Sequence, residues 1–130
     1  MAIDKATREL VRSRAGGRCE YCQLPQEHTT LTLQVEHIIP KQHWGDDEVS
    51  NLALACARCN LLKGSNLTGL DPDSGEVVRL FHPREQNWEE HFAWNGLNIL
   101  GKTPVGRTTV WLLEMNGDDR LEIRETWAET

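Results

Sequence analysis

The stretch VEHIIPKQHWGDDEVSNLALACARCNLLKG, residues 35–64, carries most of the information about the fold. It begins inside LTLQVEHII (31–39), which alternates in polarity and is rich in β-branched residues, so it predicts a strand. A polar loop follows. The segment NLALAC (51–56) predicts a brief second strand, and ARCNLLKGS (57–65) predicts a helix of about two turns. We therefore expect the order strand, loop, strand, helix.

The chain contains four cysteines, and they form two Cys-x-x-Cys pairs, Cys19 with Cys22 and Cys56 with Cys59. No apolar run approaches a membrane span, and the start MAIDKATREL lacks the apolar core of a signal peptide, so we expect a cytoplasmic protein without membrane contact. Cysteines stay reduced in the cytoplasm, and this spacing lets both thiolates of a turn face one ion. We predict one structural zinc. Four unpaired buried cysteines or a redox pair are the weaker alternatives.

The net charge of −6 is unfavourable for contact with nucleic acid, but the charge is unevenly distributed. Residues 1–64 carry equal numbers of basic and acidic side chains, whereas residues 65–130 carry six basic and twelve acidic ones. The half that holds the cysteines is therefore neutral. Charge argues weakly against a nucleic-acid role and does not exclude one.

The remaining segments predict an α+β protein. DKATRELVRSRAGG (4–17) predicts a helix that Asp4 caps. In the second half we expect a turn at DPDSG (71–75), a strand at EVVRLF (76–81), a hairpin at HFAWNGLNIL (91–100), and helices at PVGRTTVWLLEM (104–115) and DDRLEIRETWAE (118–129). We expect a zinc-bound unit over 1–66 and a C-terminal extension over 67–130, packed together as one compact domain.

Three parts of the chain resemble the motif of the HNH endonuclease family, in its subgroup stapled by a four-cysteine zinc. They are EHIIP (36–40), NLALAC (51–56) and CNLLKG (59–64), and the resemblance covers roughly residues 8–64. It implies a small ββα-metal unit, treble-clef-like, that binds one catalytic divalent ion. The later segments FHPREQNWEEHFAWN and GKTPVGRTTV also resemble extensions found on bacterial members of the family.

The resemblance implies a role for each polar residue of the motif. His37 is the expected general base, because an imidazole titrates near neutral pH and can take a proton from attacking water. Glu36 and Asn60 are the expected oxygen ligands of Mg²⁺ or Mn²⁺. Asn51 is expected to hold the loop and the strand of the base by hydrogen bonds to the backbone. Many family members have histidine at the position of Asn60, and asparagine there favours hard ions.

Other residues near the motif allow two interpretations. Arg58 and Lys63 flank the site and are expected to contact phosphate, although single exposed cations are as often merely solvated. His43 and Trp44 lie in the loop and are candidates for contact with substrate. The alternative for Trp44 is that its side chain fills part of the small core. His82 and Arg84 are weaker candidates for phosphate or metal. Six residues are expected to form the core of the second half: Trp88, His91, Phe92, Trp94, Trp111 and Trp127.

The sequence thus supports two functions. The first is a metal-dependent endonuclease that hydrolyses phosphodiester bonds in DNA, with structural zinc and catalytic magnesium or manganese; RNA cleavage uses the same chemistry and stays open. The second is a non-catalytic zinc module that binds nucleic acid or a protein partner. The acidic second half favours the latter, because it suits a basic partner better than a phosphate backbone.

Overall fold

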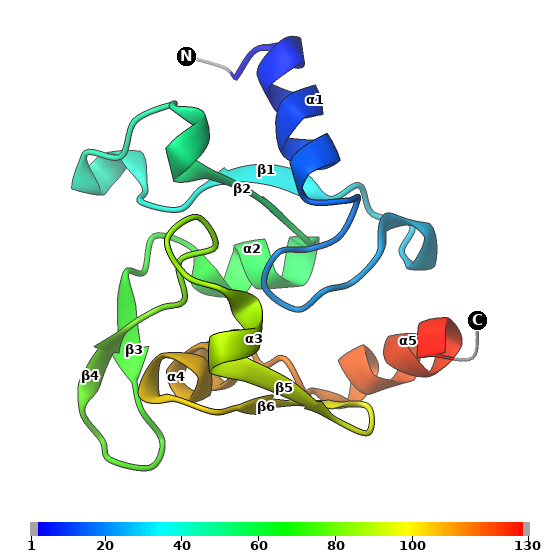
Figure 1. The fold of residues 1–130 in the computed structure, drawn as a ribbon, viewed down its shortest axis with the longest axis vertical. Coiled ribbons are helices and arrows are strands. Elements are labelled where there is room, and N and C mark those ends of the chain that lie inside the picture. Colours follow the sequence, from blue (N-terminus) through cyan, green and yellow to red (C-terminus); the bar gives the residue numbers. More distant parts are fainter. Residues whose placement is uncertain (1–2, 129–130) are drawn as a thin grey trace.

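The computed structural model describes residues 3–128 and has the mixed α+β architecture expected from the sequence (Figure 1). The helices are α1 (Lys5–Arg14), α2 (Ala57–Lys63), α3 (Trp88–His91), α4 (Pro104–Leu112) and α5 (Asp118–Ala128). The strands are β1 (Gln34–His37), β2 (Leu52–Ala55), β3 (Thr68–Leu70), β4 (Val77–Arg79), β5 (Phe92–Asn95) and β6 (Asn98–Gly101). The strands form three antiparallel two-stranded sheets, in which β1 pairs with β2, β3 with β4, and β5 with β6.

The hairpin β1–β2 and helix α2 form the expected ββα unit. In Figure 1 the hairpin runs between α1 and α2. All four residues of β2 are buried, and His37 at the end of β1 pairs with Leu52 at the start of β2. The first strand is shorter than predicted, because only Gln34–His37 have partners in β2. The hairpin is closed by a long loop that contains two short 3₁₀ helices, Lys41–His43 and Val49–Asn51.

Local signals explain where α1 begins and ends. The Asp4 carboxylate accepts a hydrogen bond from the backbone N–H of Thr7 at 2.7 Å, as a capping residue does. After the helix, Gly16 and Gly17 both adopt positive φ, which turns the chain away without steric cost. Val11 is the fully buried residue of the helix. The turn that follows delivers Cys19 and Cys22.

The second half consists of two hairpins and two longer helices, much as predicted. Gly96, with φ of +63°, turns the hairpin β5–β6, and Thr103 caps α4 ahead of Pro104. The predicted strand at 76–81 is confirmed but shorter. The sequence did not reveal β3 or α3, because β3 has three residues and α3 one turn, too few for a periodic pattern.

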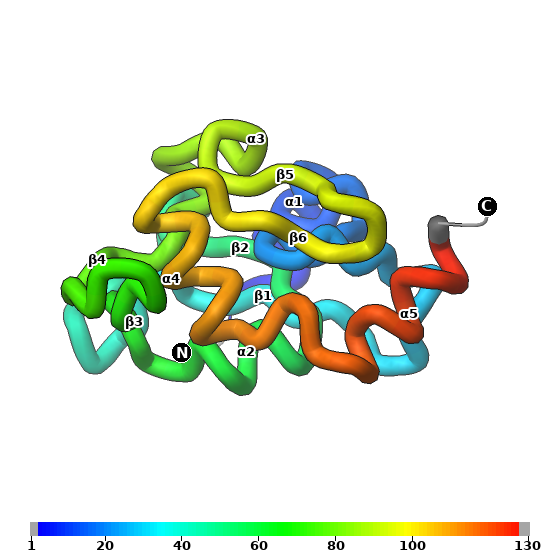
Figure 2. The backbone as a smooth tube through the Cα atoms, turned by 90° about the horizontal axis from the view of Figure 1, so that it is seen from below, coloured from blue at the N-terminus to red at the C-terminus, as the bar shows by residue number. Residues whose placement is uncertain are grey.

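Several side chains connect the second half to the half that contains the four cysteines. The indole N–H of Trp88 donates to the backbone carbonyl of Tyr21 at 2.8 Å. Arg84 forms an ion pair with Glu20, and both side chains are mostly buried. Figure 2 shows α5 close to the segment that follows α1. One hydrophobic core cluster contains residues of both halves, from Val11 to Met115. A division near residue 66 stays a prediction.

The predicted aromatic core was wrong for two residues. Phe92 is buried, and Trp88 and Trp127 pack against the core. Trp94 and Trp111, however, are 46% and 70% exposed. Trp111 lies on the outward side of α4, and Trp94 on β5 is covered only in part by Trp88, Trp127 and Arg124. Aromatic content alone does not tell which side of an element faces the core. Among the described helices, none is long and apolar enough to cross a membrane.

Candidate active site and zinc centre

The four cysteines form a cluster whose geometry fits a zinc ion. Cys19 and Cys22 come from the turn after α1, Cys56 caps α2, and Cys59 lies in its first turn. All four are buried, and their sulfur atoms lie within 4.8 Å of one another. Cys22 Sγ and Cys56 Sγ are 3.7 Å apart. Tetrahedral zinc with bonds of about 2.3 Å separates its sulfurs by about 3.8 Å, so the donor set matches.

Helix α5 contributes a basic side chain to the cysteine cluster. One guanidinium nitrogen of Arg120 donates to Cys59 Sγ at 3.0 Å, and another donates to the Leu113 carbonyl at 2.7 Å. Four thiolates around one Zn²⁺ leave a net charge of −2, which a buried guanidinium offsets. Arg120 was not singled out from the sequence, because it lies 61 residues after Cys59 and no local pattern connects the two.

The end of β1, the segment after it, and the middle and C-terminal end of α2 together line one open hollow of about 370 Å³. Glu36, His37 and Asn60 all border it. The remaining lining residues are Val35, Pro40, Lys41 and Gly64. The structure therefore brings the three residues that the sequence motif singled out to the same surface.

His37 is held by a carboxylate that the sequence analysis did not select. His37 Nε2 lies 2.6 Å from Asp47 Oδ1, and a carboxylate only accepts, so Nε2 carries the hydrogen. Asp47 also forms an ion pair with Lys41 at 3.1 Å. The hydrogen bonds from His37 and Lys41 lower the pKa of Asp47. Asp47 stands among three consecutive acids, Asp46 to Glu48, and nothing in the sequence indicates which one turns inward.

Glu36 is buried and already paired. Its side chain accepts a hydrogen bond from the Tyr21 hydroxyl at 2.5 Å and lies 3.3 Å from the ammonium of Lys63. Burial raises the pKa of Glu36, and the charge of Lys63 offsets part of this rise. A carboxylate has about four lone-pair sites, so these two contacts leave capacity for a metal ion. Its position on the hollow is compatible with a ligand role.

The side-chain amides of Asn60 and Asn51 both form hydrogen bonds within the protein. Asn60 Nδ2 donates to Gln34 Oε1 at 2.6 Å, so Asn60 meets its neighbour through nitrogen rather than through its amide oxygen. Asn51 is buried; its Oδ1 accepts from the Ile39 N–H, and its Nδ2 donates to the carbonyls of Ile39 and Asp46. Asn51 therefore links the segment after β1 to the loop that carries Asp47, and this link supports the hydrogen bond between Asp47 and His37.

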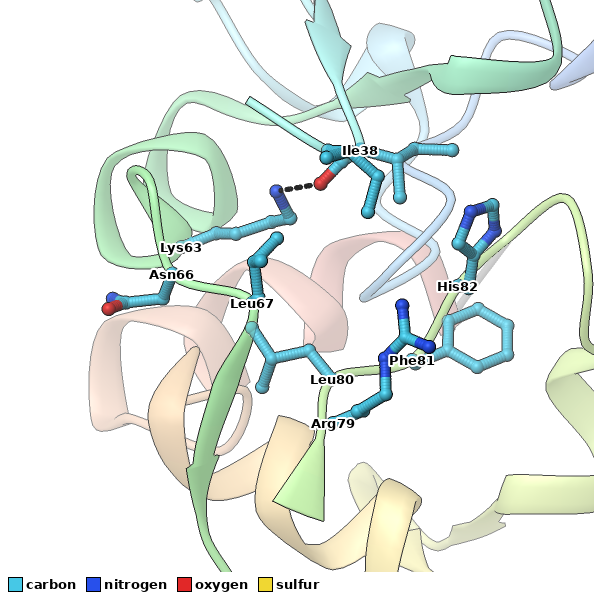
Figure 3. A pocket seen from close by; sticks show the side chains of 9 residues that line it. Ile38, Lys63, Asn66, Leu67, Arg79, Leu80, Phe81 and His82 are labelled. Atoms are coloured by element: carbon cyan, nitrogen blue, oxygen red, sulfur yellow. Dashed lines mark hydrogen bonds between the residues drawn. The ribbon is translucent and has the colours of Figure 1, made fainter. Parts of the chain in front are cut away.

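The basic candidates lie in different surroundings. Lys63 is only 2% exposed, and its ammonium also donates to the Ile38 carbonyl at 2.9 Å (Figure 3). This differs from the surface position expected from the sequence, because α2 turns Lys63 towards Glu36. Arg58 is at the surface, but it lies 3.3 Å from Glu114 and 3.4 Å from Asp119.

His82 and Arg84 border other parts of the molecule. His82 lines a cavity of about 20 Å³ with Lys63 and Arg79, shown in Figure 3, which has room for about one water molecule. Its imidazole Nδ1 accepts from the backbone N–H groups of Arg84 and Glu85. The Arg84 guanidinium pairs with Glu20. Neither residue lines the hollow that holds His37.

Comparison with known proteins identifies the segment that carries the cysteines and the hollow. The family model of the HNH endonuclease matches residues 19–66. This segment is an HNH domain. The match contains all four cysteines together with Glu36, His37 and Asn60, so the cysteine cluster and the hollow both belong to the HNH domain. The HNH family indicates a nuclease-type function and a nucleic-acid substrate.

Two curated relatives extend the similarity beyond the HNH domain. The chain is 28% identical over 109 residues to the Septu protein PtuB of Bacillus thuringiensis, covering 82% of this chain and 40% of the relative. It is 24% identical over 122 residues to the Septu protein PtuB of Bacillus mycoides (strain KBAB4), covering 75% of this chain and 41% of the relative. The chain thus spans about two fifths of the length of these relatives. No solved structure matches it.

Proposed function

We propose that this chain is a divalent-metal-dependent endonuclease that hydrolyses phosphodiester bonds in DNA, with His37 as general base. One observation carries the proposal. The His37 imidazole is held by Asp47 at the edge of a hollow that Glu36 and Asn60 also line. A base, a carboxylate and an amide on one open surface are the groups that metal-assisted hydrolysis of a phosphodiester needs.

His37 would act through its second ring nitrogen. Because Nε2 is bound to Asp47, Nδ1 is the atom that accepts a proton from the attacking water. The new bond joins the water oxygen to phosphorus, and the bond from phosphorus to the 3′ oxygen breaks. The leaving 3′ oxygen takes a proton from solvent water, so the products carry 5′-phosphate and 3′-hydroxyl ends. The Asp47 carboxylate fixes the ring and stabilises the imidazolium that forms. Lys41, which also lines the hollow, is placed to meet a phosphate oxygen. Arg58, which lies on the same helix as Asn60 but is not among the residues that line the hollow, is a candidate for a second phosphate contact.

Glu36 and Asn60 are the residues that would hold the catalytic ion. Their donors are a carboxylate and an amide oxygen, a set that suits magnesium or manganese better than a soft metal. When bound, such an ion supplies positive charge that stabilises the phosphorane-like transition state and the leaving oxygen. The cysteine-bound zinc has no open ligand position and is structural.

Both curated relatives carry the name Septu protein PtuB, which supports a more specific proposal. We infer that the chain serves as the nuclease part of a protein of the Septu PtuB type, because the similarity covers most of this chain. The cytoplasm is the compartment that suits this role, since four free cysteines suited to zinc remain reduced there.

Plasmid nicking tests the proposal directly. The wild-type protein with magnesium or manganese is expected to convert supercoiled plasmid to the nicked form. His37→Ala should lower the rate by about 10²- to 10⁴-fold, the usual contribution of a general base. His28→Ala is the control, because His28 contacts α5 and lies outside the hollow.

Two results would contradict the nuclease assignment: no cleavage by wild-type protein with any divalent ion, or equal cleavage by the His37→Ala variant. The function that then remains is a zinc module that binds nucleic acid or a protein partner.

A further inference from the structure

Trp44 is almost fully exposed to solvent, three residues after Lys41, which lines the hollow. Its exposure is 95%, the highest among the large hydrophobic residues in the described part of the chain. It ends the 3₁₀ helix Lys41–His43 in the left-handed region, with φ of +67°. The sequence left two positions open for this side chain, against substrate or inside the core. The structure excludes the core.

The backbone beneath Trp44 is held at several points. The Trp44 N–H donates to the Lys41 carbonyl at 2.9 Å, and the Gly45 N–H donates to the Pro40 carbonyl at 3.0 Å. Gly45 lies so close to the Ile39 carbonyl that an added Cβ would overlap it, at 1.6 Å. Asn51 binds the backbone on both sides of this turn, at Ile39 and at Asp46. Trp44 therefore sits on an ordered support rather than on a free loop.

The same support carries part of the candidate active site. Lys41, three residues before Trp44, lines the hollow and pairs with Asp47, which holds His37. Asn51, which fixes the turn under Trp44, also fixes the segment after His37. The indole therefore extends from the loop that also supplies Lys41 and Asp47 to the site where the phosphodiester is expected to bind.

Exposure and left-handed backbone are both unfavourable for tryptophan. An exposed indole forgoes the free energy that burial of a large aromatic side chain provides. A bulky side chain at positive φ is an uncommon conformation that clusters at functional sites. By contrast, Trp88, Trp94 and Trp127 contact other aromatic rings. Trp44 has a free ring face, which is the feature that a base-stacking platform requires.

We propose that Trp44 stacks on an unstacked base of the substrate strand, so that the chain acts on nucleic acid with accessible base faces, such as a single strand or the locally unpaired stretches of a supercoiled plasmid, rather than a relaxed duplex. The inference rests on the proposed nuclease function and deepens it. In a duplex the neighbouring base pairs cover each base face, whereas a single strand offers it to an aromatic side chain. Stacking also suits a chain of net charge −6, which gains little affinity from phosphate contacts alone.

Binding measured without cleavage tests the inference. We would prepare His37→Ala protein alone and combined with Trp44→Ala, Trp44→Phe or Trp111→Ala. Binding to a labelled 12-nucleotide DNA strand, the same sequence as RNA, and the blunt DNA duplex would be followed by fluorescence anisotropy with magnesium present. Trp111, 70% exposed on α4 and bordering another hollow, is the matched control. Zinc content and circular dichroism would verify folding of each variant.

We expect Trp44→Ala to raise the Kd for the single strand about 5- to 100-fold, the range found for loss of base–aromatic stacking. Trp44→Phe should restore most of the affinity, and Trp111→Ala should change nothing. Duplex binding should be weak and insensitive to Trp44.

The inference fails if Trp44→Ala behaves like Trp111→Ala, if the duplex loses as much affinity as the single strand, or if none of the three nucleic acids binds. Plasmid nicking by wild-type protein is a separate measurement. Cleavage that persists while Trp44 proves dispensable would overturn the stacking role and leave the nuclease function standing.

Discussion

At the scale of single residues, the position of His37 depends on partners from distant parts of the loop. Asp47 binds its Nε2, Lys41 binds Asp47, and Asn51 holds the backbone from which these side chains extend. Such an arrangement fixes which ring nitrogen carries the hydrogen, and therefore which one can accept a proton. Asp47 acts here as a positioning residue.

Asp47→Asn should lower the cleavage rate about 10- to 100-fold, because an amide cannot stabilise the imidazolium as a carboxylate does. The expected loss is smaller than that of His37→Ala, since the base itself remains. Cleavage of a labelled substrate would measure the rate. In parallel, the Nε2–H proton resonance of His37 should lose its downfield, hydrogen-bonded position.

The neighbouring variant Asp46→Asn is the matched control. It makes the same change of charge, but the Asp46 carboxylate binds the backbone N–H of Glu48 rather than His37. If Asp46→Asn and Asp47→Asn slow cleavage equally, the effect is one of net charge and the positioning role of Asp47 is refuted.

At the scale of elements, buried polar contacts attach the short hairpin β3–β4 to α4. Asp71, at the start of its turn, is buried and binds Arg107 of α4 through both carboxylate oxygens, at 3.1 and 2.9 Å. Strands of three residues make few ladder hydrogen bonds, so this bidentate pair is an important attachment for them. The hydrogen bonds from Arg107 lower the pKa of Asp71 to about 2.

This depressed pKa predicts how stability changes with pH. Asp71 binds a proton less readily in the folded chain than in the unfolded chain, so its contribution is fully present above its ordinary pKa of 3.8. That contribution is lost as the pH falls from about 4 towards 2. Asp71→Asn should therefore lower the Tm by several degrees at neutral pH, and the gap to wild type should narrow below about pH 4.

Thermal unfolding of both proteins between pH 7 and pH 3 would measure this gap. Asp73→Asn is the control, because Asp73 also meets Arg107 at 3.1 Å but is largely exposed and should matter less. A gap that stays constant down to pH 3 would show that the charge of Asp71 is not the stabilising feature.

At the scale of the whole molecule, the cysteine cluster joins segments that are distant in sequence. The turn after α1 and the start of α2 supply the thiolates, and α5 supplies Arg120. A structural zinc ion contributes folding free energy of order 10 kcal/mol, which equals the whole net stability of a typical domain. The ion would thereby hold α2, and with it Asn60, against the hairpin that carries His37.

Removal of zinc by a strong chelator should therefore abolish cooperative unfolding, not merely lower the Tm. Metal analysis is expected to find one zinc per chain before treatment, and circular dichroism melts would follow the loss of structure. Omitting magnesium while leaving zinc in place is the control and should leave the melt unchanged. A cooperative melt at the original temperature in zinc-free protein would contradict a structural role.

The sequence by itself determined those features of the structure that depend on residues close to one another in the chain. The helix caps, the positive-φ glycines, the Cys-x-x-Cys turns and the order strand, loop, strand, helix all follow from neighbours within a few positions. The same spacing brought Glu36, His37 and Asn60 to one surface, because the ββα unit packs the end of β1 beside the middle of α2.

Only the tertiary structure decided which way individual side chains turn. Asp47 rather than Asp46 binds His37, Lys63 turns inwards to Glu36, Trp44 turns outwards, and Arg120 reaches Cys59. Each outcome depends on which distant segment packs against the residue and whether its charge or ring finds a partner there. Residue type and local spacing hold no information on those long-range contacts, since the chain must fold before they exist.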